Sequence, residues 1–161
     1  MPEPFPLDAL AMVRAFVSPT EESAWLDLLE VHARVTRALD RALIDGHQLP
    51  MSAFDLLMRI AHAPSEEVTI SDLASQVAVS QSQVSRIVMD LERRGLVERR
   101  RNADDARSTC VAMTEQGFAF LHKAAPVYLQ TLRKQFLDRL GSADAEQLAA
   151  TWRRVLDDPA T

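Results

Sequence analysis

The fold of this chain is decided by residues 69–107, which read TISDLASQVAVSQSQVSRIVMDLERRGLVERRRNADDAR. The segment predicts a short helix, a turn and a longer helix, followed by a strand and a charged loop. Each helix start carries its own cap, Thr69 for the first helix and Ser80 for the second, where Gln83 completes a capping box. Gly95 marks the end of the longer helix, because glycine tolerates the left-handed turn that ends helices. The pattern is that of a helix-turn-helix with a wing.

Length and composition are those of a globular protein in a reducing compartment. The 161 residues suit one domain with additional helices for oligomerisation. A hydrophobic content of 47% and a charged content of 25% are enough for a real core. The single cysteine excludes an internal disulfide. The sequence has neither a signal peptide nor an apolar run long enough to span a membrane, so we expect a cytoplasmic protein.

The distribution of charge favours DNA as a partner, although the net charge is −5. Residues 68–113 hold seven arginines and six acidic residues, a balance of +1, and the remainder of the chain has a balance of −6. Five of those arginines lie within residues 93–101. A basic face on an acidic body is typical of a protein that touches DNA at one place.

Long helices are predicted on both sides of the motif from apolar residues at three- and four-residue steps. The first is expected to begin with Thr20 as its cap and to end at Gly46. Two more follow the wing, the first capped by Thr114 and the second restarting after Gly141. A helix of roughly 25 residues is about 38 Å long, which is too long for a small domain to cover. A partner chain is the expected cover.

These helices define the expected organisation of a single domain, 1–161. The fold class is mainly α with a small β-hairpin wing. We expect residues 20–48 and 114–156 to form a helical dimerisation platform, and residues 50–113 to form a winged helix-turn-helix lobe that binds DNA. Residues 1–19 are an N-terminal extension, either loosely docked or bracing the dimer.

The longer helix of the motif, residues 81–94, separates an apolar face from a polar one. Helices in the major groove read bases mainly through residues near their N-terminus. The candidates there are Gln81, Ser82, Gln83, Ser85 and Arg86. Glutamine can pair with adenine, and arginine with guanine, through two hydrogen bonds each. Some residues of the polar face have an alternative role without base contact. Gln83 would then serve only to complete the cap, and Arg86 to bind a phosphate. Arg93 or Arg94 would then lie in solvent at the end of the helix.

A β-hairpin wing is predicted over residues 96–113, with its loop at 102–107. Arg101 at the base of the loop and Arg107 within it are candidate DNA contacts. A loop arginine can enter a narrow minor groove, where negative potential concentrates, and Asp105 is placed to hold it. The alternative is a surface salt bridge with no role on DNA.

Four pieces of the sequence resemble, in order, the MarR family of bacterial transcription regulators. They are ISDLA at 70–74, SQVSRIVMDLERRGLVER at 82–99, D-x-R at 105–107 and M-T-x-x-G at 113–117. The resemblance implies a homodimer with a winged helix-turn-helix in each lobe. It also implies binding to palindromic operator DNA, usually as a repressor, and often release by a small ligand.

The resemblance also bears on a ligand site. Trp25 is either dimer core or, as in the urate-responsive subgroup that it resembles, part of a pocket between platform and lobe. With Trp25, the side chains of His32, Phe54 and Met58 could line such a cavity for a small aromatic or anionic ligand. One departure from the family is Ala106, where a second wing arginine is common, which puts one DNA backbone contact in doubt.

Other chemistry is not indicated. Cys110 is expected to be a small buried hydrophobe on a wing strand. The four histidines lack metal-ligand spacing, so neither a metal nor a cofactor is expected. No catalytic motif stands out, so we do not expect an enzyme. The expected function is a homodimeric, sequence-specific transcriptional regulator, a repressor of its own or a neighbouring gene. The alternative is a winged-helix module that binds protein and not specific DNA.

Overall fold

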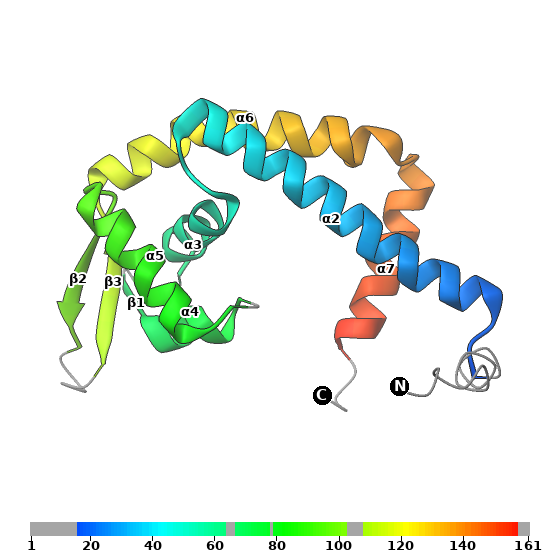
Figure 1. Ribbon diagram of the computed structural model, residues 1–161, viewed down its shortest axis with the longest axis horizontal. Helices are drawn as coiled ribbons and strands as arrows, with labels where there is room; N and C mark the ends of the chain where they lie inside the picture. The colour runs from blue at the N-terminus through cyan, green and yellow to red at the C-terminus, as the bar shows by residue number, and fades with distance from the viewer. Residues whose placement is uncertain (1–15, 64–66, 78, 103–107, 158–161) are drawn as a thin grey trace, which may run out of the picture. The chain divides into compact units, whose positions relative to one another are not determined.

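The computed structural model in Figure 1 describes residues 16–63, 67–77, 79–102 and 108–157. It is a mainly helical winged helix-turn-helix fold with a small antiparallel sheet, as the sequence predicted. In chain order the elements are α2 (Pro19–His47), α3 (Met51–Ala61), β1 (Glu67–Thr69), α4 (Ile70–Ser75), α5 (Gln81–Arg93), β2 (Val97–Arg101), β3 (Thr109–Met113), α6 (Glu115–Gln135), the 3-10 turn η1 (Leu137–Arg139) and α7 (Ser142–Leu156). The predicted N-terminal extension lies outside the described residues as far as residue 15.

The chain divides into two compact units, Met1–Arg37 and Ala38–Thr161, and α2 runs through the boundary between them. The helix-turn-helix, the wing, α6 and α7 all belong to the second unit. No helix among the described residues is both long and apolar enough to cross a membrane.

The start of α2 differs from the sequence prediction, because Ser18 and not Thr20 acts as the cap. The backbone N–H of Ser18 donates to the Glu21 carboxylate at 2.8 Å, and the Ser18 hydroxyl accepts from the Glu21 N–H at 3.3 Å. Hydrogen bonds from the Ser18 side chain and backbone lower the pKa of Glu21. Pro19 then takes the first helical position, where its missing N–H needs no partner and its fixed φ suits the helix.

The end of α2 also differs from the prediction, because the helix continues through Gly46. Gln48 takes the left-handed conformation instead, with a φ of 53°. The Gln48 N–H donates to the Ile44 carbonyl at 2.8 Å, the bond of a left-handed helix cap, and the Leu49 N–H reaches back to the Leu43 carbonyl at 3.4 Å. This turn buries the Leu49 side chain in the core, and that burial explains why the helix ends at His47, one residue later than expected.

β3 is the central strand of a sheet with the order β1-β3-β2. Val111 of β3 pairs with Val68 of β1 on one side and with Arg99 of β2 on the other. The sequence predicted the β2–β3 hairpin, which is present, and β1 adds a third strand to it. Cys110 is 7% exposed, so the prediction of a buried thiol is confirmed.

The core lies in the second unit, between α3, α5, α6 and the sheet. Its buried members are Leu43, Leu49, Ala53, Phe54, Leu56, Leu57, Ile60, Leu73, Val84, Val88, Leu91, Leu96, Val97, Val111 and Ala124. The rings of Phe54 and Tyr128 stack at 4.8 Å between centroids. Burial and, to a smaller extent, the Asp55 carboxylate raise the pKa of Tyr128.

Two glycines fix the junction between α5, the wing and α6. Gly95 has a φ of +71°, the left-handed conformation that the sequence predicted for the end of α5. Gly117 packs so closely that an added Cβ would lie 2.0 Å from the Leu96 carbonyl oxygen. The Thr114 hydroxyl caps α6 by accepting from the Gly117 N–H at 2.9 Å, as predicted. The glycine at 117 is therefore required by contact with the wing backbone.

Candidate nucleic-acid interface

The N-terminus of α5 is held by the complete capping box that the sequence predicted. The Gln83 N–H donates to the Ser80 hydroxyl at 3.4 Å, and the Ser80 N–H donates to Gln83 Oε1 at 3.2 Å. Two-point pairing with adenine uses both the oxygen and the nitrogen of a glutamine amide. Since the oxygen of Gln83 is engaged in the cap, only its NH₂ group can reach a base while the cap is intact.

The predicted α5 candidates form one accessible surface at the start of the helix. Gln81, Ser82, Gln83 and Arg86 are exposed, and Ser85 is half-buried. The Gln81 amide donates to the Ser71 hydroxyl of α4 at 3.2 Å, and the hydroxyls of Ser82 and Ser80 lie 3.0 Å apart. On the opposite face Val84, Val88 and Leu91 are buried, so the orientation of α5 is fixed by its core contacts.

Arg86 differs from most arginines around it, because no hydrogen bond or ion pair joins it to a residue that the structure describes. Three of its neighbours are already paired with carboxylates. The pairs are Arg93 with Asp90, Arg99 with Glu92 at 2.7 Å, and Arg100 with Glu98. The arginine cluster at 93–101 is thus largely neutralised within the protein, and the cation that α5 presents is Arg86.

The wing adds a second cation at the end of β2. Arg101 is exposed and pairs in register with Thr109 of β3. No ion pair joins it to any residue in the described part of the chain. Beyond it, the Asn102 N–H donates to the Ser108 carbonyl at 3.1 Å and closes the hairpin. The candidates Asp105 and Arg107, with Ala106, lie outside the described residues, so their roles stay predictions.

The ligand candidates occupy different environments. Trp25 is 60% exposed and His32 is exposed, both on the part of α2 that belongs to the first unit. Phe54 is fully buried in the core of the second unit. Met58 is half-buried and lines a pocket of about 430 Å³ between α3, β1 and α4.

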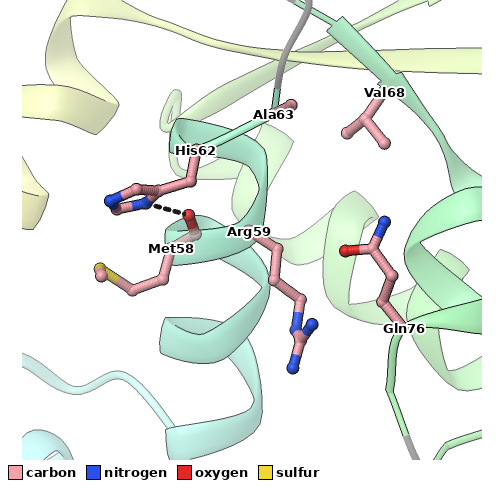
Figure 2. Close-up of a pocket in the computed structure, with 6 residues that line it drawn as sticks. All are labelled: Met58, Arg59, His62, Ala63, Val68 and Gln76. Atoms are coloured by element: carbon pink, nitrogen blue, oxygen red, sulfur yellow. Dashed lines mark hydrogen bonds between the residues drawn. The ribbon is translucent and has the colours of Figure 1, made fainter. Parts of the chain in front are cut away.

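Figure 2 shows this pocket, with Arg59 of α3 and Gln76 at the end of α4 on facing walls. The remaining lining is contributed by Met58, His62, Ala63 and Val68. The His62 Nδ1 lies 2.8 Å from the Met58 carbonyl oxygen, and Arg59 donates to the Asp55 carboxylate at 3.0 Å. Within the described residues, no group of three His, Cys, Asp or Glu side chains could hold a metal ion.

Comparison with known proteins finds relatives in one family of regulators. The sequence model of the MarR family matches residues 47–108, from the end of α2 to the start of β3. The structure superimposes on AbsC, a MarR family transcriptional regulator from Streptomyces coelicolor, with a TM-score of 0.78. The two chains are 27% identical over 88% of this chain and 95% of AbsC. The chain is therefore similar to MarR family regulators, and the family model matches the part of it that contains the helix-turn-helix.

Other similar proteins are also regulators of transcription. Sco3205 of Streptomyces coelicolor, a family member solved in complex with DNA, is 25% identical with a TM-score of 0.80, over 89% of this chain and 91% of Sco3205. The HTH-type regulator YdgJ of Bacillus subtilis is 38% identical over 43% of this chain and 41% of YdgJ. The repressor MprA of Escherichia coli is 28% identical over 64% of this chain and 58% of MprA. The alignments with YdgJ and MprA therefore span less than two thirds of those proteins.

Sequence reasoning left the role of Arg94 open, with a solvated helix end as one alternative, and did not predict that its side chain contacts other helices. The side chain turns inward to α2 and α6. The only hint in the sequence is that Arg94 directly precedes Gly95, at the end of a helix, where a long side chain can reach the carbonyls of another helix end. Its partners, the carbonyls of His47 and Gln48, are too distant in sequence to be predicted from a local pattern.

Proposed function

We propose that this protein is a homodimeric, sequence-specific DNA-binding regulator of transcription in the MarR family. The observation that carries the proposal is the geometry of α5. Its apolar face is buried in the core, its N-terminus is locked by the capping box, and its exposed start presents Arg86, which is paired with none of the residues that the structure describes. A helix held in this way can enter the major groove with its first two turns toward the bases.

The relatives support DNA as the partner and repression as the effect. Sco3205 is a structural relative found in complex with DNA, and MprA is a transcriptional repressor. On this basis each lobe, residues 50–113, places α5 in the major groove and its wing loop beside the minor groove, with Arg101 at the edge. A two-fold dimer requires a palindromic operator with half-sites about 34 Å apart.

Exposed apolar side chains support a homodimer. The helices at the two ends of the chain carry large apolar residues that the single chain leaves in solvent. They include Trp25, Leu26 and Leu29 of α2, Leu129 of α6, and Val155 and Leu156 of α7. A second copy would cover them, because burial of apolar surface is the main favourable term in stable association. This supports the division into a platform at 20–48 and 114–156 around the lobe.

Regulation by a small ligand and a cytoplasmic location complete the proposal. A small aromatic or anionic ligand would release DNA if it bound better to the arrangement of lobes that does not fit the operator. Trp25, His32, Phe54 and Met58 are the proposed contacts, and Phe54 could be reached only by displacing its stacking partner Tyr128. Such a regulator acts on chromosomal DNA by binding alone, so no catalytic role is proposed.

The decisive experiment is a gel shift with the DNA upstream of the gene that encodes this protein, at moderate salt and with excess unrelated competitor. We expect one complex, formed by a dimer, that Arg86→Ala weakens. Arg139→Ala, which removes an exposed arginine on η1, serves as the matched control and is expected to shift like the wild type. A verified dimer that gives no specific shift would refute the proposal and favour a protein-binding winged helix.

A further inference from the structure

We propose that Arg94 is a positioning residue, which fastens the C-terminal end of α5 to the ends of two other helices, and that it does not contact DNA. The inference rests on the proposed DNA-binding function, because it concerns how the reading helix α5 is held for that task. The role proposed for Arg94 differs from that of its neighbour Arg93, which is exposed and paired with Asp90 on the same helix.

The first attachment is to the end of α2. The two terminal nitrogens of Arg94 donate to the carbonyls of Gln48 at 3.0 Å and His47 at 3.2 Å. Carbonyls at a helix end lack partners within the helix, and they form the negative end of its dipole. A planar guanidinium can bridge two adjacent carbonyls with a fixed geometry, which a lysine ammonium does not reproduce. Arg94 therefore serves as a side-chain cap for α2 although it lies 46 residues further along the chain.

The second attachment is to the start of α6. The Arg94 guanidinium lies 5.2 Å from the centroid of the Phe120 ring, a cation–π contact. The Gln116 amide donates to the Arg94 carbonyl at 3.2 Å. Phe120 also meets the His47 ring edge to face at 5.8 Å. The ends of α2 and α5 and the start of α6 thus meet at one half-buried arginine.

These contacts fix the position of α5 along its axis, which the packing of its buried face does not. Packing of Val84, Val88 and Leu91 is strong, but apolar contact is non-directional and leaves small shifts along the helix axis inexpensive. Hydrogen bonds from a charged donor are directional and stronger than neutral ones. Since binding side chains must be held to within about 0.5 Å of their productive geometry, loosening this end of α5 should impair base reading at the other.

The test compares the salt dependence of operator binding in Arg94→Lys and Arg94→Ala with the wild type, by fluorescence anisotropy. We expect roughly tenfold weaker specific binding for both variants, about the loss of one base contact. The slope of log K against log salt should stay at the wild-type value. Removal of a phosphate contact would instead reduce that slope by about 0.9. A flatter slope in Arg94→Ala, or wild-type affinity in Arg94→Lys, would overturn the proposal.

A second readout is independent of DNA. Hydrogen exchange of the full-length protein should show faster exchange of the backbone amides at residues 91–95 in Arg94→Lys than in the wild type, and unchanged exchange would contradict the positioning role. If neither Arg94 variant folds, Phe120→Leu removes the cation–π contact while keeping an apolar side chain, and it should show the same changes. Wild-type protein that binds no upstream DNA refutes the proposed function, whereas the exchange result still decides the role of Arg94.

Discussion

Among the glycines at 46, 95, 117 and 141, Gly117 has the least room for a side chain. An added Cβ would meet the Leu96 backbone carbonyl at 2.0 Å, and a backbone atom in a buried junction cannot move aside cheaply. We expect Gly117→Ala to lower the free energy of unfolding by about 3 kcal/mol, the upper range for overpacking. Urea denaturation followed by circular dichroism measures this change.

Gly46 provides the matched control in α2. The nearest atoms to an added Cβ there are those of Val127, at 3.9 Å, which is ordinary contact. Because Gly46 is helical, Gly46→Ala should raise the free energy of unfolding by about 0.5–1 kcal/mol. Equal destabilisation by the two substitutions would show that steric contact is not what distinguishes these glycines.

Arg86 is expected to carry specificity. Because no described residue pairs with it, its guanidinium is available to a guanine or to a phosphate. Arg86→Ala should weaken operator binding by about 1–3 kcal/mol and relax the preference at one base pair if the side chain reads a base. Anisotropy with a panel of single-base operator variants measures this. A uniform loss across the panel, with a flatter salt slope, would assign Arg86 to phosphate.

At the scale of the element, one residue at the start of α5, Gln83, both caps the helix and is a candidate for contact with a DNA base. Gln83→Glu keeps a side-chain oxygen for the Ser80 N–H, and a negative charge suits a helix N-terminus, so stability should stay within about 0.5 kcal/mol of the wild type. DNA affinity should fall, because the NH₂ donor is lost. Gln83→Ala should instead cost about 1 kcal/mol of stability.

Denaturation and anisotropy on the same two variants separate the roles of Gln83. If Gln83→Glu binds DNA as tightly as the wild type, the residue is a cap only.

Local signals explain which elements could be predicted from the sequence. The caps at Thr69, Ser80 and Thr114 and the left-handed Gly95 depend on residues within a turn of each other, and all four are as predicted. The buried face of α5 follows from its helical period. These features need no information about the rest of the fold.

The features that the sequence did not predict have two causes: competition between neighbouring local signals, and contacts between residues far apart in the sequence. Thr20 is a good cap, but Pro19 before it suits the first helical position, so Ser18 takes the cap. Gly46 is a good stop signal, but burial of Leu49 sets the turn at Gln48. The inward position of Arg94 depends on carbonyls 46 residues away, which no local pattern encodes.

At the scale of the whole molecule, the apolar face of α7 is the most direct test of the dimer. Val155 is 61% exposed in the single chain. Val155→Glu should shift the protein toward monomer in sedimentation experiments, because a charge in an apolar interface is not compensated. Operator binding should weaken strongly, since two linked lobes bind far more tightly than one.

Ala150→Glu is the matched control for this prediction. Ala150 is exposed on the same helix, and helical geometry places it on the face opposite to Val155. It should leave both the dimer and the affinity unchanged. A dimer that survives Val155→Glu would exclude this face of α7 from the interface.

The position of Cys110 has a practical consequence for measuring the molecule in solution. It is the only cysteine of the chain, and it lies buried in the central strand of the sheet. A thiol-specific spin label should therefore ignore the native protein and react with a single added cysteine, such as Gln76→Cys at the exposed end of α4. In a dimer, the two labels would report the separation of the helix-turn-helix motifs by pulsed electron resonance, with and without DNA.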